Sequence, residues 1–351
     1  MMRALSLVAV LLMMVAGCAH VPVPEEPLFY PQDMTAARLQ YLTSFSDPFD
    51  VEPRPSKFLS FLIGQPAPRD GIHKPYGVAF GKGKLYVADT GFAAIHVIDF
   101  AKGHWDYFRP EGVGRLKFPI CVTVDSDENL YVSDSVRGQV FIYNASGRFI
   151  GALGAALELK VVDVKVFGDK VYACDLKSKT VRVYSRRDHQ FLNAIPRDSK
   201  EGKGALYAPT NLAIDLAGRI YVSDSGTFHV QVYDADGTFL RSIGRHGDGI
   251  GEFARNKGVA VDRESRVYVV DAAFQNVQIF TSEGQALLSL GDPGTGSRGE
   301  LVLPAGITVD YENTEWFKTF AAPNFEIDYL VAVVNQYGAR KINVYGFGHK
   351  R

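Results

Sequence analysis

The sequence predicts an all-β fold, a six-bladed β-propeller whose blades are four-stranded antiparallel sheets. The first observation is a short apolar motif that ends in an acidic residue and recurs along the chain. Its five clear copies are KLYVADT (84–90), NLYVSDS (129–135), KVYACDL (170–176), RIYVSDS (219–225) and RVYVVDA (266–272), and YLVAVVNQ (329–336) is a degenerate sixth. Their aspartates, at positions 89, 134, 175, 224 and 271, are 45, 41, 49 and 47 residues apart. Repeats of this length are typical of propeller blades.

The second observation is that every copy has the same kind of neighbours. An apolar strand precedes it, such as GVAF (77–80), and a third strand begins six residues after each of the five aspartates. A fourth strand often follows a polar turn, as in TFLRSIG (238–244). Period-2 alternation bounded by Gly and Asp indicates β-strands, and Asp236-Gly237 is a tight-hairpin dipeptide. Four short strands per repeat make up a blade.

The repeated phrase P-x-G-V-A-V-D…I-Y-V-x-D-S…V-Q-V-F resembles the NHL repeat, which belongs to a family of six-bladed propellers. The resemblance extends over residues 75–345 and implies one propeller domain, which we expect to occupy residues 37–348. It implies no particular activity, because such propellers carry many unrelated functions.

The two ends of the chain are predicted to meet in the sixth blade. That blade ends at residues 341–345, and the few residues that remain are too short for a fourth strand. The segment RLQYLTSF (38–45) has no blade of its own and matches the pattern of the outer strands. We therefore expect it to supply the missing outer strand and to close the ring, which leaves no open seam.

An export signal is predicted before the propeller. Arg3 is followed by an uncharged run over 4–16 that is apolar apart from Ser6, too short to span a bilayer comfortably but typical of a signal peptide. The run ends in VAGC (15–18), which resembles a bacterial lipobox with Val in place of the commoner Leu. The prediction is a signal peptide at 1–17 and lipidation of Cys18. An ordinary signal peptide with an incidental cysteine is the alternative.

Lipidation would anchor the protein to a membrane surface. Residues 18–36 are expected to form an extended tether that adds nothing to a core, because residues 19–36 contain four prolines and no clear period. Ala19 stands where Asp would resemble an inner-membrane retention signal, which favours the outer membrane of a Gram-negative bacterium. The domain would then face the periplasm or the cell surface.

The repeated aspartates are interpreted as structural rather than metal-binding. An Asp at the end of a strand accepts hydrogen bonds from backbone N–H groups of the next turn. Recurrence in every clear copy favours that role.

The first strand of each blade should line the central channel, and one column of these strands varies. Its members are Gly77, Cys121, Asp163, Asn211, Gly258 and Gly306. Asp163 and Asn211 would lie on adjacent blades near the channel mouth, and calcium prefers oxygen ligands of these kinds. The arrangement resembles calcium-dependent lactone hydrolases, which hold the ion at the propeller centre. The column contains one carboxylate, however, and a wet polar channel is the interpretation we favour.

Loops at one edge of the blades carry cations and aromatic residues. The candidate partner-binding residues are Arg137, Phe228, Phe274, Arg255, Lys257, Tyr76 and Phe92. Aromatic and arginine side chains suit a protein-binding surface. Solvated lysines, with rings tucked between blades, are the alternative. The net charge of −1 argues against a nucleic-acid partner.

Several classes of enzyme are disfavoured. The Gly-rich segments 244–253 and 291–300 lack the Lys-Ser/Thr ending of a phosphate loop, and no nucleophile elbow or zincin motif is present. No histidine falls in the channel column, which counts against the amidating lyases of this fold. The sequence therefore predicts a membrane-anchored, extracytoplasmic binding or scaffold protein with no catalytic residue assigned. A calcium-assisted hydrolase or lactonase, with Asp163 and Asn211 as ligands, is the alternative.

Overall fold

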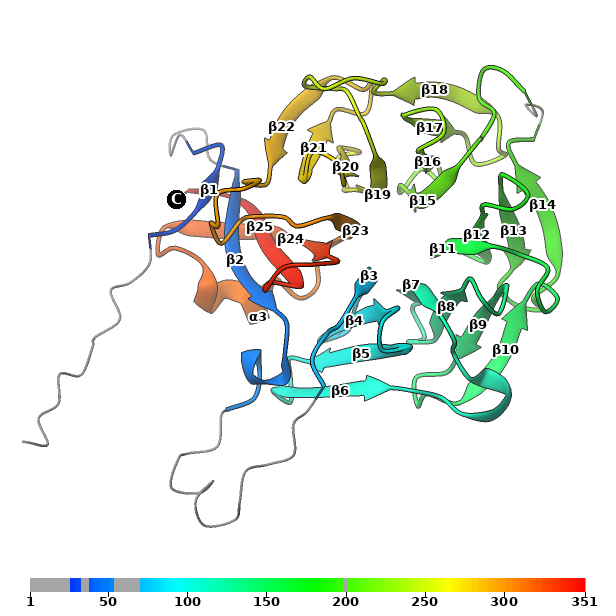
Figure 1. Cartoon of the computed structure of the whole chain (residues 1–351), viewed down its shortest axis with the longest axis horizontal. Helices are drawn as coiled ribbons and strands as arrows, with labels where there is room; N and C mark the ends of the chain where they lie inside the picture. Colours follow the sequence, from blue (N-terminus) through cyan, green and yellow to red (C-terminus); the bar gives the residue numbers. More distant parts are fainter. Residues whose placement is uncertain (1–25, 33–37, 54–69, 198–200, 351) are drawn as a thin grey trace, which may run out of the picture.

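The computed structural model describes residues 26–32, 38–53, 70–197 and 201–350. Within them, six β-sheets are arranged in a ring (Figure 1). Five sheets have four strands and the sixth has five, and all strand pairs between neighbours are antiparallel. The predicted six-bladed propeller is therefore confirmed. No helix among these residues is long and apolar enough to cross a membrane.

Blades 1 to 5 are each built from four consecutive strands. Blade 1 contains β3 (Pro75–Gly81), β4 (Lys84–Asp89), β5 (Ala94–Asp99) and β6 (His104–Phe108). Blade 2 contains β7 (Pro119–Val124), β8 (Leu130–Asp134), β9 (Gln139–Tyr143) and β10 (Phe149–Leu153). Blade 3 contains β11 (Val161–Phe167), β12 (Lys170–Asp175), β13 (Thr180–Ser185) and β14 (Phe191–Ile195).

Blades 4 and 5 continue the same order. Blade 4 contains β15 (Pro209–Ile214), β16 (Ile220–Asp224), β17 (His229–Tyr233) and β18 (Phe239–Ile243). Blade 5 contains β19 (Asn256–Val261), β20 (Val267–Asp271), β21 (Asn276–Phe280) and β22 (Ala286–Leu290). Short 3-10 turns occur at η1 (Pro48–Asp50) and η2 (Gly112–Gly114).

Blade 6 is built from both ends of the chain. Its strand order is β1 (Phe29–Tyr30), β2 (Leu39–Phe45), β25 (Ile342–Lys350), β24 (Phe325–Asn335) and β23 (Pro304–Asp310). β2 pairs with β25 from Leu39 opposite Phe347 to Phe45 opposite Ile342. This confirms that residues 38–45 close the ring. The insertion before β24 contains α3 (Thr314–Phe317) and η3 (Lys318–Phe320).

The expected tether differs from the structure at its C-terminal part. Phe29 and Tyr30 form β1 beside β2 and are buried, although residues 18–36 were expected to contribute nothing to a core. Phe29 packs edge-on against Phe325, with 5.4 Å between ring centroids. Two residues between prolines are too short to show a strand period, so the sequence pattern did not reveal them.

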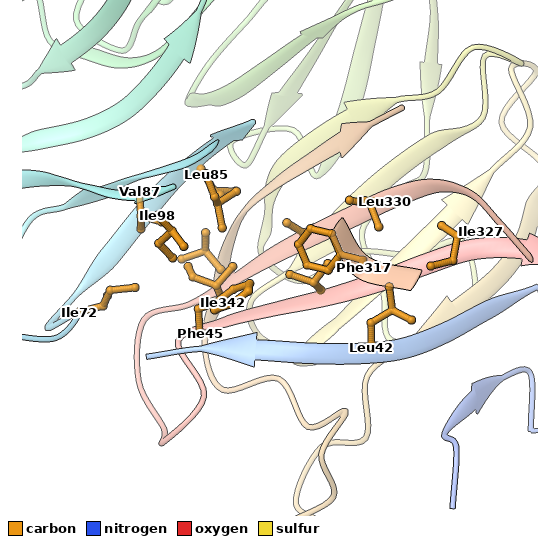
Figure 2. Close-up of a cluster of buried hydrophobic side chains, with 14 of the residues drawn as sticks. Leu42, Phe45, Ile72, Leu85, Val87, Ile98, Phe317, Ile327, Leu330 and Ile342 are labelled. Atoms are coloured by element: carbon orange, nitrogen blue, oxygen red, sulfur yellow. The ribbon is translucent and has the colours of Figure 1, made fainter. Parts of the chain in front are cut away.

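A hydrophobic cluster connects the closing blade to blade 1 (Figure 2). Leu42 and Phe45 of β2 share it with Leu85 and Val87 of β4. Phe317 of the insertion lies in the same cluster. The seam between the two chain ends is thus held by buried apolar area as well as by strand pairing.

The inner strands approach one another closely around the axis. A Cβ atom on Gly306 would lie 2.4 Å from the backbone oxygen of Tyr76, and one on Gly77 would lie 2.6 Å from the Cα of Cys121. Glycine in this column therefore permits close contact between adjacent blades.

The repeated aspartates hold the loops on one face of the disc. We call this the mouth face; it is the face on which the inner strands β3, β7, β11, β15, β19 and β23 begin. The buried carboxylate of Asp271 accepts from the backbone N–H groups of Ala254 (2.8 Å), Arg255 (3.1 Å), Ala273 (2.8 Å) and Phe274 (3.1 Å). The structural role predicted for this column is confirmed.

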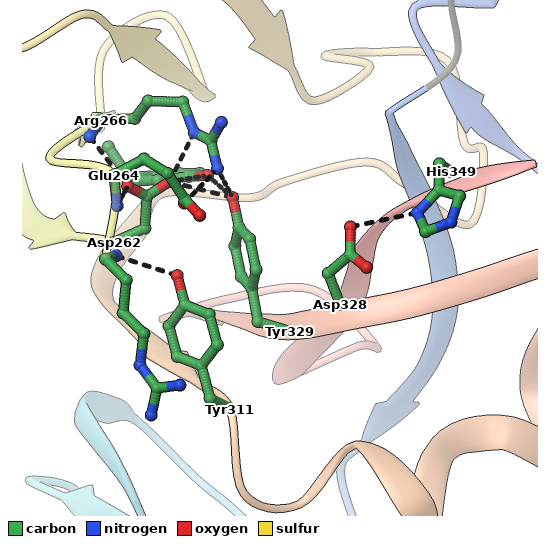
Figure 3. A network of polar contacts seen from close by, with 9 residues as sticks. Asp262, Glu264, Arg266, Tyr311, Asp328, Tyr329 and His349 are labelled. Atoms are coloured by element: carbon green, nitrogen blue, oxygen red, sulfur yellow. Dashed lines mark hydrogen bonds and ion pairs between the residues drawn. The ribbon is translucent and has the colours of Figure 1, made fainter.

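The opposite face, where the inner strands end in hairpin turns, uses a second set of aspartates. We call it the hairpin face. Asp262 accepts from Arg266 Nε (2.6 Å), from the Tyr268 hydroxyl (3.1 Å) and from the Tyr329 hydroxyl (3.0 Å) (Figure 3). Because Tyr329 belongs to β24, this network connects blade 5 to blade 6.

Candidate functional site

Asp163 and Asn211 lie together on the channel wall, as the variable column predicted. Asp163, on β11, is 1% exposed and its carboxylate accepts from the Lys165 ammonium at 3.0 Å. It also accepts from the backbone N–H groups of Val164 (2.7 Å) and Leu212 (2.9 Å), and from Asn211 Nδ2 (3.3 Å). Both carboxylate oxygens are therefore occupied by donors.

This cluster does not fit a calcium ion. Calcium takes six to eight oxygen ligands, whereas the Asp163 oxygens already accept four hydrogen bonds. Asn211 Oδ1 is the acceptor in the cluster that has no partner within the described ranges. The ammonium of Lys165 would also repel a cation placed beside Asp163. No group of three or more His, Cys, Asp or Glu side chains in the described part of the chain could hold a metal.

Lys165 was not among the residues singled out in the sequence, although it stands two positions after Asp163. Residues two apart on a strand share a face, and that spacing was the available signal. Burial would lower the pKa of Lys165, but the Asp163 carboxylate raises it above its ordinary value, so the ammonium is charged. The opposite charges of Asp163 and Lys165 therefore cancel within the channel wall.

Cys121 contributes a thiol rather than a thiolate. Its Sγ lies 3.8 Å from Lys165 Nζ, but burial and the Asp163 carboxylate raise the pKa of the thiol to about 12. A thiol of this kind is a poor nucleophile. Cys121 and Cys174 are both buried and free. We assign the cluster of Cys121, Asp163, Asn211 and Lys165 a structural role.

A cavity opens on the mouth face, and its lining includes Ile120, which precedes Cys121 in the chain. It has a volume of about 180 Å³. Its cationic lining consists of Lys74 from the loop before β3, Arg255 from the loop before β19, and Lys257 of β19. Phe118, Ile120 and Leu303 supply apolar walls. The cavity thus brings together residues from blades 1, 2, 5 and 6.

Tyr76 and Lys257 meet across this cavity. Lys257 Nζ donates to the Tyr76 hydroxyl at 3.2 Å. Burial, together with the positive charge of Arg255, lowers the pKa of Lys257. Burial, together with the Asp163 carboxylate, raises the pKa of the Tyr76 hydroxyl, which stays protonated. The lining contains no Asp or Glu side chain among the residues that the structure describes.

The other predicted mouth-face residues differ in availability. Arg137 donates to the backbone oxygens of Arg115 (2.7 Å) and Val113 (3.2 Å), so its guanidinium is engaged within its own blade. Phe92 is 9% exposed and packs beneath Arg109 (4.6 Å from the guanidinium carbon to the ring centroid). Its expected availability as a contact residue is therefore corrected: it belongs to the packing between strands.

Phe228 and Phe274 are half-buried and lie in the loops after the repeated aspartates. The ring of Phe228 lies against His246, with 4.4 Å between ring centroids. Two other rings on the mouth face are more exposed, Tyr207 at 45% and Tyr337 at 50%. Lys179 lies over Tyr207 and Lys74 over Tyr337, at 5.8 Å and 5.6 Å from the ring centroids. Sequence reasoning missed both tyrosines because exposure depends on neighbouring blades.

Comparison with known proteins supports the fold and leaves the activity open. A family described as "6-bladed beta-propeller" matches residues 211–273. No curated protein matches the sequence.

Solved structures resemble the whole propeller at low identity. A Bacteroides thetaiotaomicron protein of unknown function is 16% identical with a TM-score of 0.62, over 87% of this chain and 75% of that one. A gluconolactonase from Xanthomonas campestris is 16% identical with a TM-score of 0.58, over 93% and 97%. A streptogramin B lyase is 11% identical with a TM-score of 0.55, over 89% of both chains. At these identities the likeness shows the shared fold.

Proposed function

We propose that this protein is a lipid-anchored, extracytoplasmic NHL-type propeller that acts as a binding or scaffold protein, with a protein partner on its mouth face. The observation that carries the proposal is the set of cations around the mouth cavity. Lys74, Arg255 and Lys257 form no ion pair with a carboxylate in the part of the chain that the structure describes. Cations beside exposed rings such as Tyr207 and Tyr337 suit a protein interface.

The anchor is part of the proposal and rests on Cys18, which lies outside the described residues. A lipidated Cys18 would hold the propeller at the membrane and leave one face free for a partner. Replacing Cys18 by Ser should move the protein from the detergent phase to the aqueous phase after export. Retention of the variant in the detergent phase would contradict the anchor.

Affinity capture tests the binding face. The soluble domain, immobilised as bait, is compared with the double variant Lys74→Glu/Arg255→Glu and with Lys102→Glu as a matched control. Lys102 lies in the turn between β5 and β6, is 74% exposed at its side chain and pairs with Asp99 at 3.3 Å. We expect membrane extracts to yield a protein retained by the wild type and the control but lost from the double variant. Identical capture by all three would contradict a mouth-face interface.

A further inference from the structure

The mouth cavity contains positive charge that its own lining does not balance. Lys257 is half-buried, and Lys74 and Arg255 stand at the rim. The backbone N–H groups of Lys74 and Arg255 are held by the repeated aspartates, at 2.9 Å from Asp89 Oδ1 and 3.1 Å from Asp271 Oδ2. Those carboxylates are thereby used to fix the loops, and the cationic side chains are left facing the cavity.

The buried carboxylate of Asp163 in the channel wall does not supply the missing charge either. Asp163 is already neutralised by Lys165 at 3.0 Å and accepts two backbone N–H groups. A partly buried ammonium without a counterion is unfavourable. Burial and the charge of Arg255 lower the pKa of Lys257, which agrees with an excess of positive charge in the cavity.

The hydrogen-bond donors that line the cavity are of the kinds that bind an oxyanion. Lys257 donates one of its three N–H groups to the Tyr76 hydroxyl at 3.2 Å, which leaves others to donate. The Tyr76 hydroxyl donates to no acceptor within the described ranges. Arg255 offers a guanidinium, which binds carboxylate or phosphate through two parallel hydrogen bonds.

We propose that the mouth cavity binds an oxyanionic group, with Lys257, Arg255 and the Tyr76 hydroxyl as its donors. The inference rests on the proposed function, because it names the chemical group that the mouth face receives. The volume of about 180 Å³ is smaller than that of a typical ligand pocket, so the cavity accommodates a terminal group rather than a whole ligand. The apolar walls from Phe118, Ile120 and Leu303 favour a carboxylate on a hydrophobic body over inorganic phosphate.

Titration calorimetry at low ionic strength tests the site directly, with benzoate, acetate and inorganic phosphate as probes. We expect wild-type protein to bind benzoate more tightly than acetate or phosphate. Lys257→Met keeps the unbranched apolar part of the side chain and removes the ammonium group, so it should weaken benzoate binding about tenfold or more. Lys102→Met, at the exposed turn, should change it less than about twofold.

The thermal unfolding of each variant is measured in parallel, and Arg255→Met is included because its exposed side chain can be removed without disturbing the core. Absence of benzoate binding to the wild type would overturn the proposal, as would equal affinities for the wild type and both folded cavity variants.

Addition of benzoate to the affinity capture distinguishes the source of the anion. Competition identifies a carboxylate of the protein partner, and binding without competition identifies a separate small carboxylate. Partner capture that persists without any benzoate binding would overturn the oxyanion site alone.

Discussion

The mouth face and the hairpin face both carry cations in loops and at strand ends, but the partners of these cations differ. On the hairpin face, Arg186 pairs with Asp125 at 2.9 Å, and Arg219 and Arg266 pair with Asp215 and Asp262, each at 2.6 Å. On the mouth face, the described residues provide no carboxylate for Lys74, Arg255 or Lys257. Cationic side chains thus form structural ion pairs on the hairpin face, whereas those around the mouth cavity have no carboxylate partner among the described residues.

The difference follows from what each set of aspartates accepts. Asp262 takes two backbone N–H groups of its own hairpin turn with Oδ1 and keeps Oδ2 for Arg266, which is four residues later. Asp271 uses both oxygens for backbone N–H groups in two loops. Asp271 therefore has no oxygen left for a cation, whereas Asp175, whose Oδ1 accepts backbone N–H groups from two loops, keeps Oδ2 for Arg182 at 3.5 Å.

Opening the ring should have the largest effect, because both faces depend on closure. Deletion of residues 38–45 removes β2, whose side chains Leu39, Leu42 and Phe45 are buried. We expect the melting temperature to fall by several degrees or more. A deletion variant that melts like the parent would rule out closure by β2.

A pair of point variants tests the same seam if the deletion variant does not fold. Leu42 in β2 and Leu240 in β18 are both the extra residue of an outer-strand bulge, but Leu42 is buried and Leu240 is exposed. Leu42→Ala should cost about 2–3 kcal/mol in the free energy of unfolding, and Leu240→Ala less than about 0.5 kcal/mol. Equal losses would contradict the role of the closing strand.

Removing one cation from each face should show that the hairpin-face cation stabilises the fold more than the mouth-face cation does. Arg266→Met leaves the buried Asp262 carboxylate without its partner and should cost about 2–3 kcal/mol in the free energy of unfolding. Lys257→Met removes a cation that has no counterion and should cost less than about 1 kcal/mol. Chemical denaturation at pH 7 gives both values. A larger loss for Lys257→Met than for Arg266→Met would reverse the comparison.

Acid should weaken the mouth face through Asp89, which holds the loop that carries Lys74. Burial would raise the pKa of Asp89, but hydrogen bonds from His96 and from the backbone N–H groups of Lys74 and His73 lower it from 3.8 to about 2. A carboxylate whose pKa is lower in the folded state stabilises the protein above about pH 4 and loses that contribution as the pH falls toward 2.

The expected loss is about 2 kcal/mol in the free energy of unfolding. Asp89→Asn cannot titrate at this position, so the stability difference between wild type and variant should narrow by that amount between pH 5 and pH 2. A difference that stays constant over this range would contradict the lowered pKa.

Modest effects are expected at the half-buried rings of the mouth face. Phe228→Ala and Phe274→Ala should each lower the free energy of unfolding by about 1 kcal/mol, because these side chains keep part of their surface in water. Phe92→Ala is the buried control and should cost about 3 kcal/mol or more. Equal and large losses of stability for all three variants would show that Phe228 and Phe274 are core residues.

The repeats made the fold and the closing strand predictable. A period near 45 residues defines the blades, and an outer-strand pattern without a blade leaves one place for residues 38–45. The opposite charges of Asp262 and Arg266, four residues apart across a hairpin turn, are a local signal for their ion pair. The sequence analysis named Tyr76, Arg255 and Lys257 as candidates, but it could not predict the shape of the cavity. The contact between Tyr76 and Lys257 depends on how far each inner strand lies from the axis. The exposure of Tyr207 and Tyr337 depends on neighbouring blades in the same way.

The most direct test compares cross-linking from the two faces. A photoreactive phenylalanine analogue replaces Tyr337 on the mouth face or, as the matched control, Leu216, which is 71% exposed in a hairpin turn of blade 4. Each protein is irradiated in intact cells that express it. We expect the Tyr337 position to form a discrete cross-linked product that disappears with Arg255→Glu, and the Leu216 position to form none. The same product from Leu216, or its persistence with Arg255→Glu, would contradict a binding site on the mouth face.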